Sequence, residues 1–192
     1  MIATIPYRML RPAPLLLASQ SATAEVSANL DYGFYTADAD PQSSLSAILK
    51  RSASPSRQAS GFFAWTDWRV SWHLKWHTTA SGECSITLVT TTLTGTITLP
   101  RLENASPAQE REFDGLLPAL RVHELGHYQI GRDTADAIDH GIQSLPPMAD
   151  CDALGAGANQ LGHGILDTQL KVEVQYDLVT HHGKTQGAWL ER

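Results

Sequence analysis

Apolar and polar side chains alternate between residues 68 and 77, and this alternation predicts a β-strand. The apolar side chains occupy the even positions, which are Trp68, Val70, Trp72, Leu74 and Trp76. A period of two sends successive side chains to opposite faces, so one face is expected to be buried and the other solvated. The tryptophans alone are four residues apart, as on a helix, but a helix would place Val70 and Leu74 on its polar face. The strand is therefore the better interpretation.

Two other segments in the first half of the chain have the composition of strands. Residues 28–37 form a short candidate strand, and residues 83–100 are rich in Thr, Ile, Val and Leu. The second segment is expected to form two strands or one bent strand ending at Pro100. Residues 43–53 are typical of a short helix, with Ser43 or Ser44 as its N-cap. The first half therefore predicts a sheet with one short helix.

The second half of the chain has a helical pattern. A helix is expected to begin after Ser106 as N-cap, with Pro107 at its first position and Gln109 at its third. Apolar residues at helical spacing continue to Leu145, although Pro118 is expected to kink or restart the helix. A last helix is expected from about residue 150 to about residue 178. Strands followed by two long helices predict an α+β fold, with an antiparallel sheet at the N-terminal end.

Composition and charge narrow the class of protein. The chain has 192 residues, of which 42% are apolar and 18% charged, and this suits one globular domain. The net charge of −6 and the scattered Lys and Arg argue against a nucleic-acid partner, because no basic patch would neutralise phosphates. No stretch is long and apolar enough to span a bilayer, so stable membrane insertion is not expected. The sequence does not define an oligomeric state.

Residues 1–24 have the order of a secretory leader. Arg8 and Arg11 precede a short apolar run, and the segment ends in Ala22-Thr23-Ala24, which has the small-residue form of a cleavage site. A disordered N-terminal tail is the alternative interpretation. In either case the folded domain is expected at residues 25–192.

Whether the two cysteines form a disulfide depends on whether the protein is exported. Cys84 and Cys151 are far apart in the sequence and lie outside any C-x-x-C pattern. In an exported protein they are expected to form one disulfide, which would stabilise the fold by about 4 kcal/mol in the chain-entropy model. In the cytoplasm they would be buried thiols.

His123, Glu124 and His127 form an H-E-x-x-H motif inside the first long predicted helix. Residues four apart share one face of a helix, so both imidazoles can reach one metal ion. Glu124 then lies beside the open coordination position, where it can accept a proton from water. Imidazole ligands favour Zn²⁺. The alternative is a helix with two surface histidines that bind nothing.

A third ligand could come from the same helix, at Asp133. Its spacing from His123 matches the metzincin pattern, but that pattern needs a glycine where this chain has Ile130. On a continuous helix Asp133 would lie about 9 Å beyond His127 along the axis and on a different face. It could then not reach the metal.

Two other candidates come from the end of the chain. Glu173 could complete the site from the last helix, as in gluzincins, with Asp177 orienting a ligand from outside the metal shell. The other candidate is a histidine of the pair His181 and His182, where Gly183 would permit a tight turn back over the motif. Spacing alone leaves both candidates open.

The motifs occur in a combination that is more specific than H-E-x-x-H alone. Along the chain, a cysteine opening a strand is followed by an H-E-x-G-H helix, a cysteine opening the last helix and a terminal Y-D-x-x-T-x-H-G-x-x-Q-G run. The residues are His123, Glu124, Gly126, His127, Cys84, Cys151, Tyr176, Asp177, Thr180, His182, Gly183, Gln186 and Gly187. From about residue 30 to its end the chain resembles a family of bacterial domains of unknown function that are predicted to be secreted zinc-dependent proteases. The resemblance implies export, and it implies that His182, not His181, is the functional histidine.

With His182 as third ligand, the predicted site holds Zn²⁺ between His123, His127 and His182 and leaves a fourth position open for water. Glu124 would act as general base and then as proton donor to the leaving amine. Tyr176 is a candidate partner for the oxyanion. A core tyrosine that packs the end of the last helix is the alternative for this residue.

The predicted function is that of a zinc-dependent metallopeptidase, secreted or periplasmic, acting on peptide or protein substrates. An amidase acting on cell-wall peptide is an alternative, because metal, base and water serve any amide. A non-catalytic binding or scaffold domain with a structural zinc is the other. Glu124 favours an enzyme, since a structural site has no need of a carboxylate beside the metal.

Overall fold

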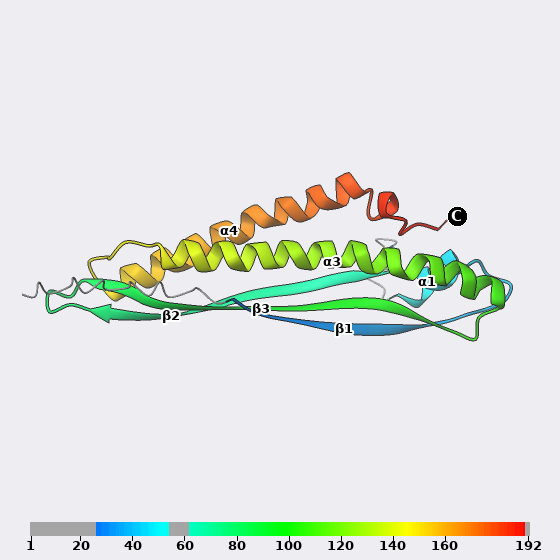
Figure 1. Cartoon of the computed structure of the whole chain (residues 1–192), viewed down its shortest axis with the longest axis horizontal. Coiled ribbons are helices and arrows are strands. Elements are labelled where there is room, and N and C mark those ends of the chain that lie inside the picture. The colour runs from blue at the N-terminus through cyan, green and yellow to red at the C-terminus, as the bar shows by residue number, and fades with distance from the viewer. Residues whose placement is uncertain (1–25, 54–61, 191–192) are drawn as a thin grey trace, which may run out of the picture.

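The computed structural model describes residues 26–53 and 62–190, so the expected leader at residues 1–24 lies outside the described residues. The described part confirms the α+β fold, with a sheet at the N-terminal end and long helices after it (Figure 1). The strands are β1 (Val26–Asp38), β2 (Trp65–Thr78) and β3 (Cys84–Glu103). The helices are α1 (Leu45–Ser52), α3 (Pro107–Gln143), α4 (Cys151–Thr180) and the short 3₁₀ helix η1 (Lys184–Gln186).

The sheet is mixed, and the expectation of a wholly antiparallel sheet was wrong. Its strand order is β1-β3-β2, with β2 antiparallel to β3 and β1 parallel to it. The chain runs along β1, crosses through α1, returns along β2 and turns through a tight hairpin into β3. Because β2 runs opposite to β1 and the hairpin reverses the chain again, β3 runs in the same direction as β1. Trp68, Val70, Trp72 and Leu74 of β2 pack against the core, as the alternation predicted. Trp76 departs from the prediction: it follows a register shift after Lys75 and is 47% exposed.

Residues 84–103 form one long strand that passes through Pro100 instead of ending there. The last β2–β3 pair joins Trp65 to Thr98, so at Pro100 the strand pairs only with β1. A proline lacks the amide hydrogen, and the missing donor is tolerated here because β3 no longer pairs with β2.

Helix α3 is continuous over 37 residues and does not restart at Pro118. Its start is the expected one: the Ser106 side chain accepts from the Gln109 amide, and the Gln109 side chain accepts from the Ser106 amide. Pro118 lies on the exposed face, while Leu116 and Leu120 on either side of it are buried. Packing of these neighbours holds the helix together where the proline removes one backbone hydrogen bond.

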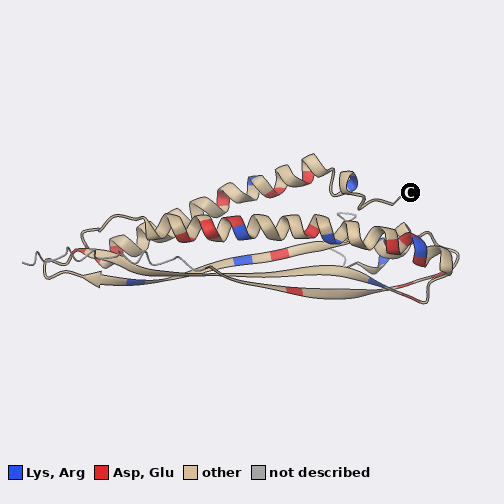
Figure 2. Cartoon of the chain, in the orientation of Figure 1, with Lys and Arg blue, Asp and Glu red and all other residues tan. Residues whose placement is uncertain are grey.

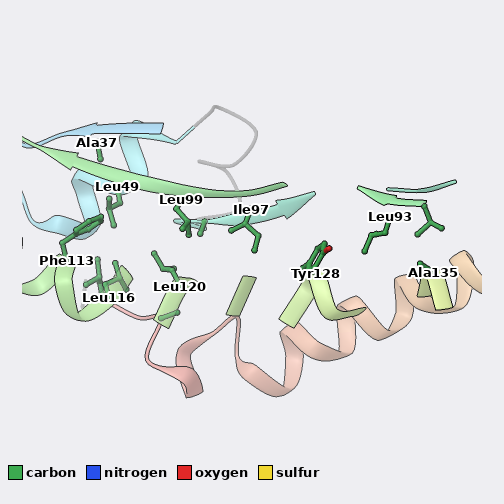
Figure 3. Close-up of a cluster of buried hydrophobic side chains, with 14 of the residues drawn as sticks. Ala37, Leu49, Leu93, Ile97, Leu99, Phe113, Leu116, Leu120, Tyr128 and Ala135 are labelled. Carbon is green, nitrogen blue, oxygen red and sulfur yellow. The ribbon is translucent and has the colours of Figure 1, made fainter. Parts of the chain in front are cut away.

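The core lies between the sheet and α3 (Figure 3). Leu93, Ile97 and Leu99 are fully buried on the face of β3 that meets α3, and they pack with buried apolar side chains of that helix. Helix α4 runs back along α3, and its C-terminal half rises away from the sheet (Figure 1). The last turns of α4 therefore lie against the H-E-x-x-H part of α3.

A disulfide joins Cys84 at the start of β3 to Cys151 at the start of α4, which confirms the predicted pairing. The disulfide joins the end of the sheet where β3 begins to α4, the helix that carries the candidate residues Glu173 and Asp177. None of the described helices is long and apolar enough to cross a membrane. In Figure 2, Lys and Arg are spread over helices and strands without gathering on one element.

Candidate metal centre

The middle of α3, the last turns of α4 and the start of β2 surround a cleft of about 520 Å³. Apolar side chains form part of its wall, among them Phe62, Phe63 and Leu190. The two histidines that follow α4 also line it, together with residues of both long helices: His123, Glu124, His127, Glu173 and Asp177. The structure thus brings the H-E-x-x-H motif and the candidate ligands from the end of the chain into one cleft.

The two motif histidines point their Nε2 atoms at one carboxylate oxygen. Asp177 Oδ1 lies 3.2 Å from Nε2 of His123 and 3.2 Å from Nε2 of His127. Three possible ligand atoms, one from each of these residues, lie within 4.8 Å of one another. His123 is buried, and the side chains of His127 and Asp177 are largely buried. This is the only such group of His, Cys, Asp or Glu within residues 26–53 and 62–190.

The Nδ1 nitrogen of each imidazole, on the side of the ring away from Asp177, makes a hydrogen bond of its own. His123 Nδ1 donates to Gln186 Oε1 at 2.9 Å, and His127 Nδ1 donates to Glu173 Oε2. A neutral imidazole has one N–H, so a proton held at Nδ1 leaves the Nε2 lone pair free. Both free lone pairs then face the same oxygen of Asp177. A cation between them, or a proton on one of the two imidazoles, satisfies three acceptors that face one another at such distances.

Electrostatics around the two histidines differ. Burial lowers the pKa of His123, and the hydrogen bond that His123 donates to Gln186 only partly opposes this effect. Burial would also lower the pKa of His127, but the hydrogen bond and charge of Glu173, with the charges of Asp177 and Glu124, outweigh it and raise that pKa. The neighbouring carboxylates therefore favour the positively charged form of the His127 imidazole.

Glu124 is held on the sheet side of the motif. It is 4% exposed, and the Thr66 hydroxyl lies 2.8 Å from its Oε2 and 2.9 Å from its backbone carbonyl. Thr66 comes from β2, so the sheet fixes the carboxylate next to the two imidazoles. A buried carboxylate in a fixed position at the cleft wall suits a group that exchanges protons with a substrate.

The residues at the end of the chain take different positions from those that spacing suggested. Asp177 lies on the Nε2 side of both motif histidines, whereas Glu173 binds the outer nitrogen of His127 and accepts from Trp68 Nε1 at 2.7 Å. His182 Nδ1 lies 3.5 Å from Asp177 Oδ2, and its side chain is 51% exposed at the rim. Asp133 is exposed on α3, away from the group of ligand atoms.

Tyr176 packs directly on the motif. Its ring stacks on that of His123 at 5.1 Å between centroids, and its hydroxyl donates to the His123 carbonyl at 3.1 Å. Gly126 makes this contact possible, because a Cβ atom there would lie 2.0 Å from the Tyr176 hydroxyl oxygen. Burial raises the pKa of the Tyr176 hydroxyl, which therefore stays protonated and able to donate.

Three residues that matter for this geometry carried no assigned role in the sequence. Thr66 and Trp68 come from β2 and contact Glu124 and Glu173, but contacts across more than fifty residues leave no local pattern. Gln186 was part of the terminal run that resembles the bacterial family, without a stated role. Its position in that run was the only available signal.

The donor set fits a zinc ion. Two imidazole nitrogens and a carboxylate oxygen are ligands that zinc takes in proteins, and the outer nitrogens have the acceptors that metal-binding histidines usually have. The three carboxylates of Glu124, Glu173 and Asp177 supply the negative charge that favours a divalent ion here.

The family model of bacterial proteins of unknown function (DUF922) matches residues 32–183. The match includes the H-E-x-x-H motif, both cysteines, Asp177 and His182. No curated protein and no solved structure matches the chain.

Proposed function

The chain belongs to the bacterial family DUF922, and we propose that it is a zinc-dependent peptidase. One observation carries the proposal: two histidines of H-E-x-x-H and Asp177 converge within 4.8 Å, and the glutamate of the motif is fixed beside them in an open cleft. A structural zinc site is usually closed by four protein ligands and needs no such carboxylate. The arrangement therefore favours catalysis.

His123 and His127 would hold the ion, and geometry favours Asp177 as the third ligand, because its Oδ1 already faces both Nε2 atoms. His182 is the third ligand that the family resemblance implies, and it lies against the other oxygen of Asp177. Zinc in such a site supplies a Lewis acid that polarises a carbonyl and lowers the pKa of water to about 7.

Glu124 would accept the proton from the water that attacks the peptide carbonyl and carry it on a carboxylate oxygen. It would then deliver this proton to the nitrogen of the leaving amine. The Thr66 hydroxyl keeps the carboxylate in place during both transfers. Glu173 and Gln186 keep the imidazoles oriented from behind.

Tyr176 is the proposed partner for the oxyanion that forms on the carbonyl. Its hydroxyl donates to the His123 carbonyl in this structure, so binding an oxyanion requires that it exchange one acceptor for another. Tyr176→Phe separates the oxyanion role from a packing role. If the hydroxyl stabilises the oxyanion, the substitution should lower kcat with little change in zinc content. If Tyr176 only packs against the motif, kcat should stay unchanged.

The substrate we propose is a peptide or protein outside the cytoplasm. The start of β2, an edge strand of the described sheet, borders the cleft at Trp65 and Thr66, and an extended peptide is proposed to lie along it. The Cys84–Cys151 disulfide supports a secreted or periplasmic location, because disulfides persist in oxidising compartments.

The test is hydrolysis of a fluorogenic peptide library by zinc-reconstituted protein and by Glu124→Gln prepared in parallel. Glu124→Gln should keep its zinc and lose about 10²- to 10⁴-fold in kcat, since it removes the proton acceptor alone. Zinc content of Asp177→Ala, His182→Ala and Glu173→Ala assigns the third ligand. Equal hydrolysis by wild type and Glu124→Gln would refute the peptidase proposal.

A further inference from the structure

The chain leaves α4 through a turn of residues 181–187, called here the C-terminal turn, and this turn closes on the back of the His123 ring. His181, His182 and Gly183 all have left-handed backbone conformations, with φ of 49°, 51° and 81°. The His182 amide donates to the Asp177 carbonyl at 2.8 Å, which bends the chain back toward α3.

Gly183 is in contact with the ring that the turn approaches. A Cβ atom at this position would lie 3.0 Å from Cγ of His123 and 2.9 Å from Cβ of Ala188. A side chain there would push the turn away from His123, and the positive φ favours glycine independently. The turn is therefore built to lie close against one motif histidine.

Gln186 uses both ends of its side-chain amide in this contact. Its Oε1 accepts from His123 Nδ1 at 2.9 Å, and its Nε2 donates to the Tyr176 hydroxyl at 3.0 Å. Tyr176 in turn donates to the His123 carbonyl at 3.1 Å. The three residues thus form a closed loop of hydrogen bonds, in which each donor and acceptor role is determined by the next.

We propose that Gln186 is a positioning residue that keeps the His123 proton on Nδ1 and thereby directs Nε2 into the metal site. This inference rests on the proposed zinc site and adds the element that prepares it for the metal. The physical reason is that an imidazole whose Nδ1–H is bonded keeps that tautomer and that ring orientation, and outer-shell partners of this kind typically contribute 10- to 100-fold to metal affinity.

The first arm of the test needs no substitution. In metal-free wild-type protein, the ¹⁵N shifts and ring couplings of His123 report which nitrogen carries the proton of the neutral imidazole. The expected result is the Nδ1–H tautomer. An Nε2–H tautomer would overturn the proposal, because the proton would then occupy the position that must bind metal.

The second arm compares zinc dissociation constants, measured by competition with a chromophoric chelator. Gln186→Leu removes the acceptor and should weaken zinc binding about 10- to 100-fold. Gln186→Glu restores an acceptor for Nδ1–H and should bind zinc within a few-fold of wild type. Thr185→Val is the matched control, since it removes a hydrogen bond within the same turn, to the Thr180 carbonyl, without touching His123.

Thr185→Val should lower the melting temperature but leave the zinc dissociation constant within about two-fold, because the lost bond is a turn bond only. If Gln186→Leu binds zinc as tightly as wild type, or if Thr185→Val weakens binding equally, Gln186 has no specific role and the proposal fails. If wild type binds no zinc, the proposed peptidase fails, while the tautomer measurement still decides whether Gln186 directs His123.

Discussion

Gly126→Ala tests the packing of Tyr176 on the motif helix. The added Cβ would lie 2.0 Å from the Tyr176 hydroxyl oxygen and 2.3 Å from its Cζ, so the ring must move. Movement breaks two hydrogen bonds, to the His123 carbonyl and from Gln186, each contributing about 1 kcal/mol. Overpacking costs about 1–3 kcal/mol more, and the better helix propensity of alanine returns about 1 kcal/mol. The expected net loss in free energy of unfolding is about 2–4 kcal/mol.

Urea unfolding of Gly126→Ala beside Gly115→Ala measures this difference. Gly115 lies on the same helix, and a Cβ there would meet no atom within 4 Å, so alanine should stabilise by up to about 1 kcal/mol. In a Tyr176→Ala background the cost of Gly126→Ala should vanish, because the two effects share one contact. If Gly126→Ala is as harmless as Gly115→Ala in the otherwise wild-type chain, the close contact is not present and the reasoning is refuted.

Three other predictions concern the support around the site. Trp68→Phe should weaken zinc affinity several-fold, because it removes the indole hydrogen bond to Glu173. Trp72→Phe is the control: it loses an indole hydrogen bond to a different residue and should leave zinc affinity unchanged in the same titration. Replacing Cys84 and Cys151 together by alanine should lower the free energy of unfolding by about 2–5 kcal/mol in urea, and an unchanged midpoint would contradict the role of the disulfide. Zinc at about 100 times its dissociation constant should stabilise the wild-type fold by about 2.7 kcal/mol in calorimetry, and a chelator should abolish this gain.

Much of the fold follows from local pattern. The capping box at Ser106 and the apolar period of 3.6 define where α3 begins and which face it buries, and the alternation around Trp72 defines β2. The parallel pairing of β1 with β3 has no such local signal, because strand composition is the same for either direction. Pro118 misleads for a related reason: its effect depends on tertiary packing of the residues beside it, which a local rule does not include.

The site, like the fold, could be predicted only where its residues form a local sequence pattern. H-E-x-x-H is local, so the faces of His123 and His127 were predictable. Glu173 and Asp177 are four residues apart and share one face of α4, so spacing cannot tell which of them meets the Nε2 atoms. That choice depends on how α4 packs on α3, and the close contact of Gly126 with Tyr176 is one part of this packing.

The central claim is that the two motif histidines hold one zinc ion. Anomalous diffraction at the zinc edge, from crystals of zinc-reconstituted wild-type protein, tests it most directly. The account predicts one peak per chain at about 2.0–2.1 Å from Nε2 of both His123 and His127, with a further protein ligand from the end of α4 or the C-terminal turn. A reconstituted crystal with no peak between these two histidines, or with zinc bound only elsewhere on the chain, would contradict it.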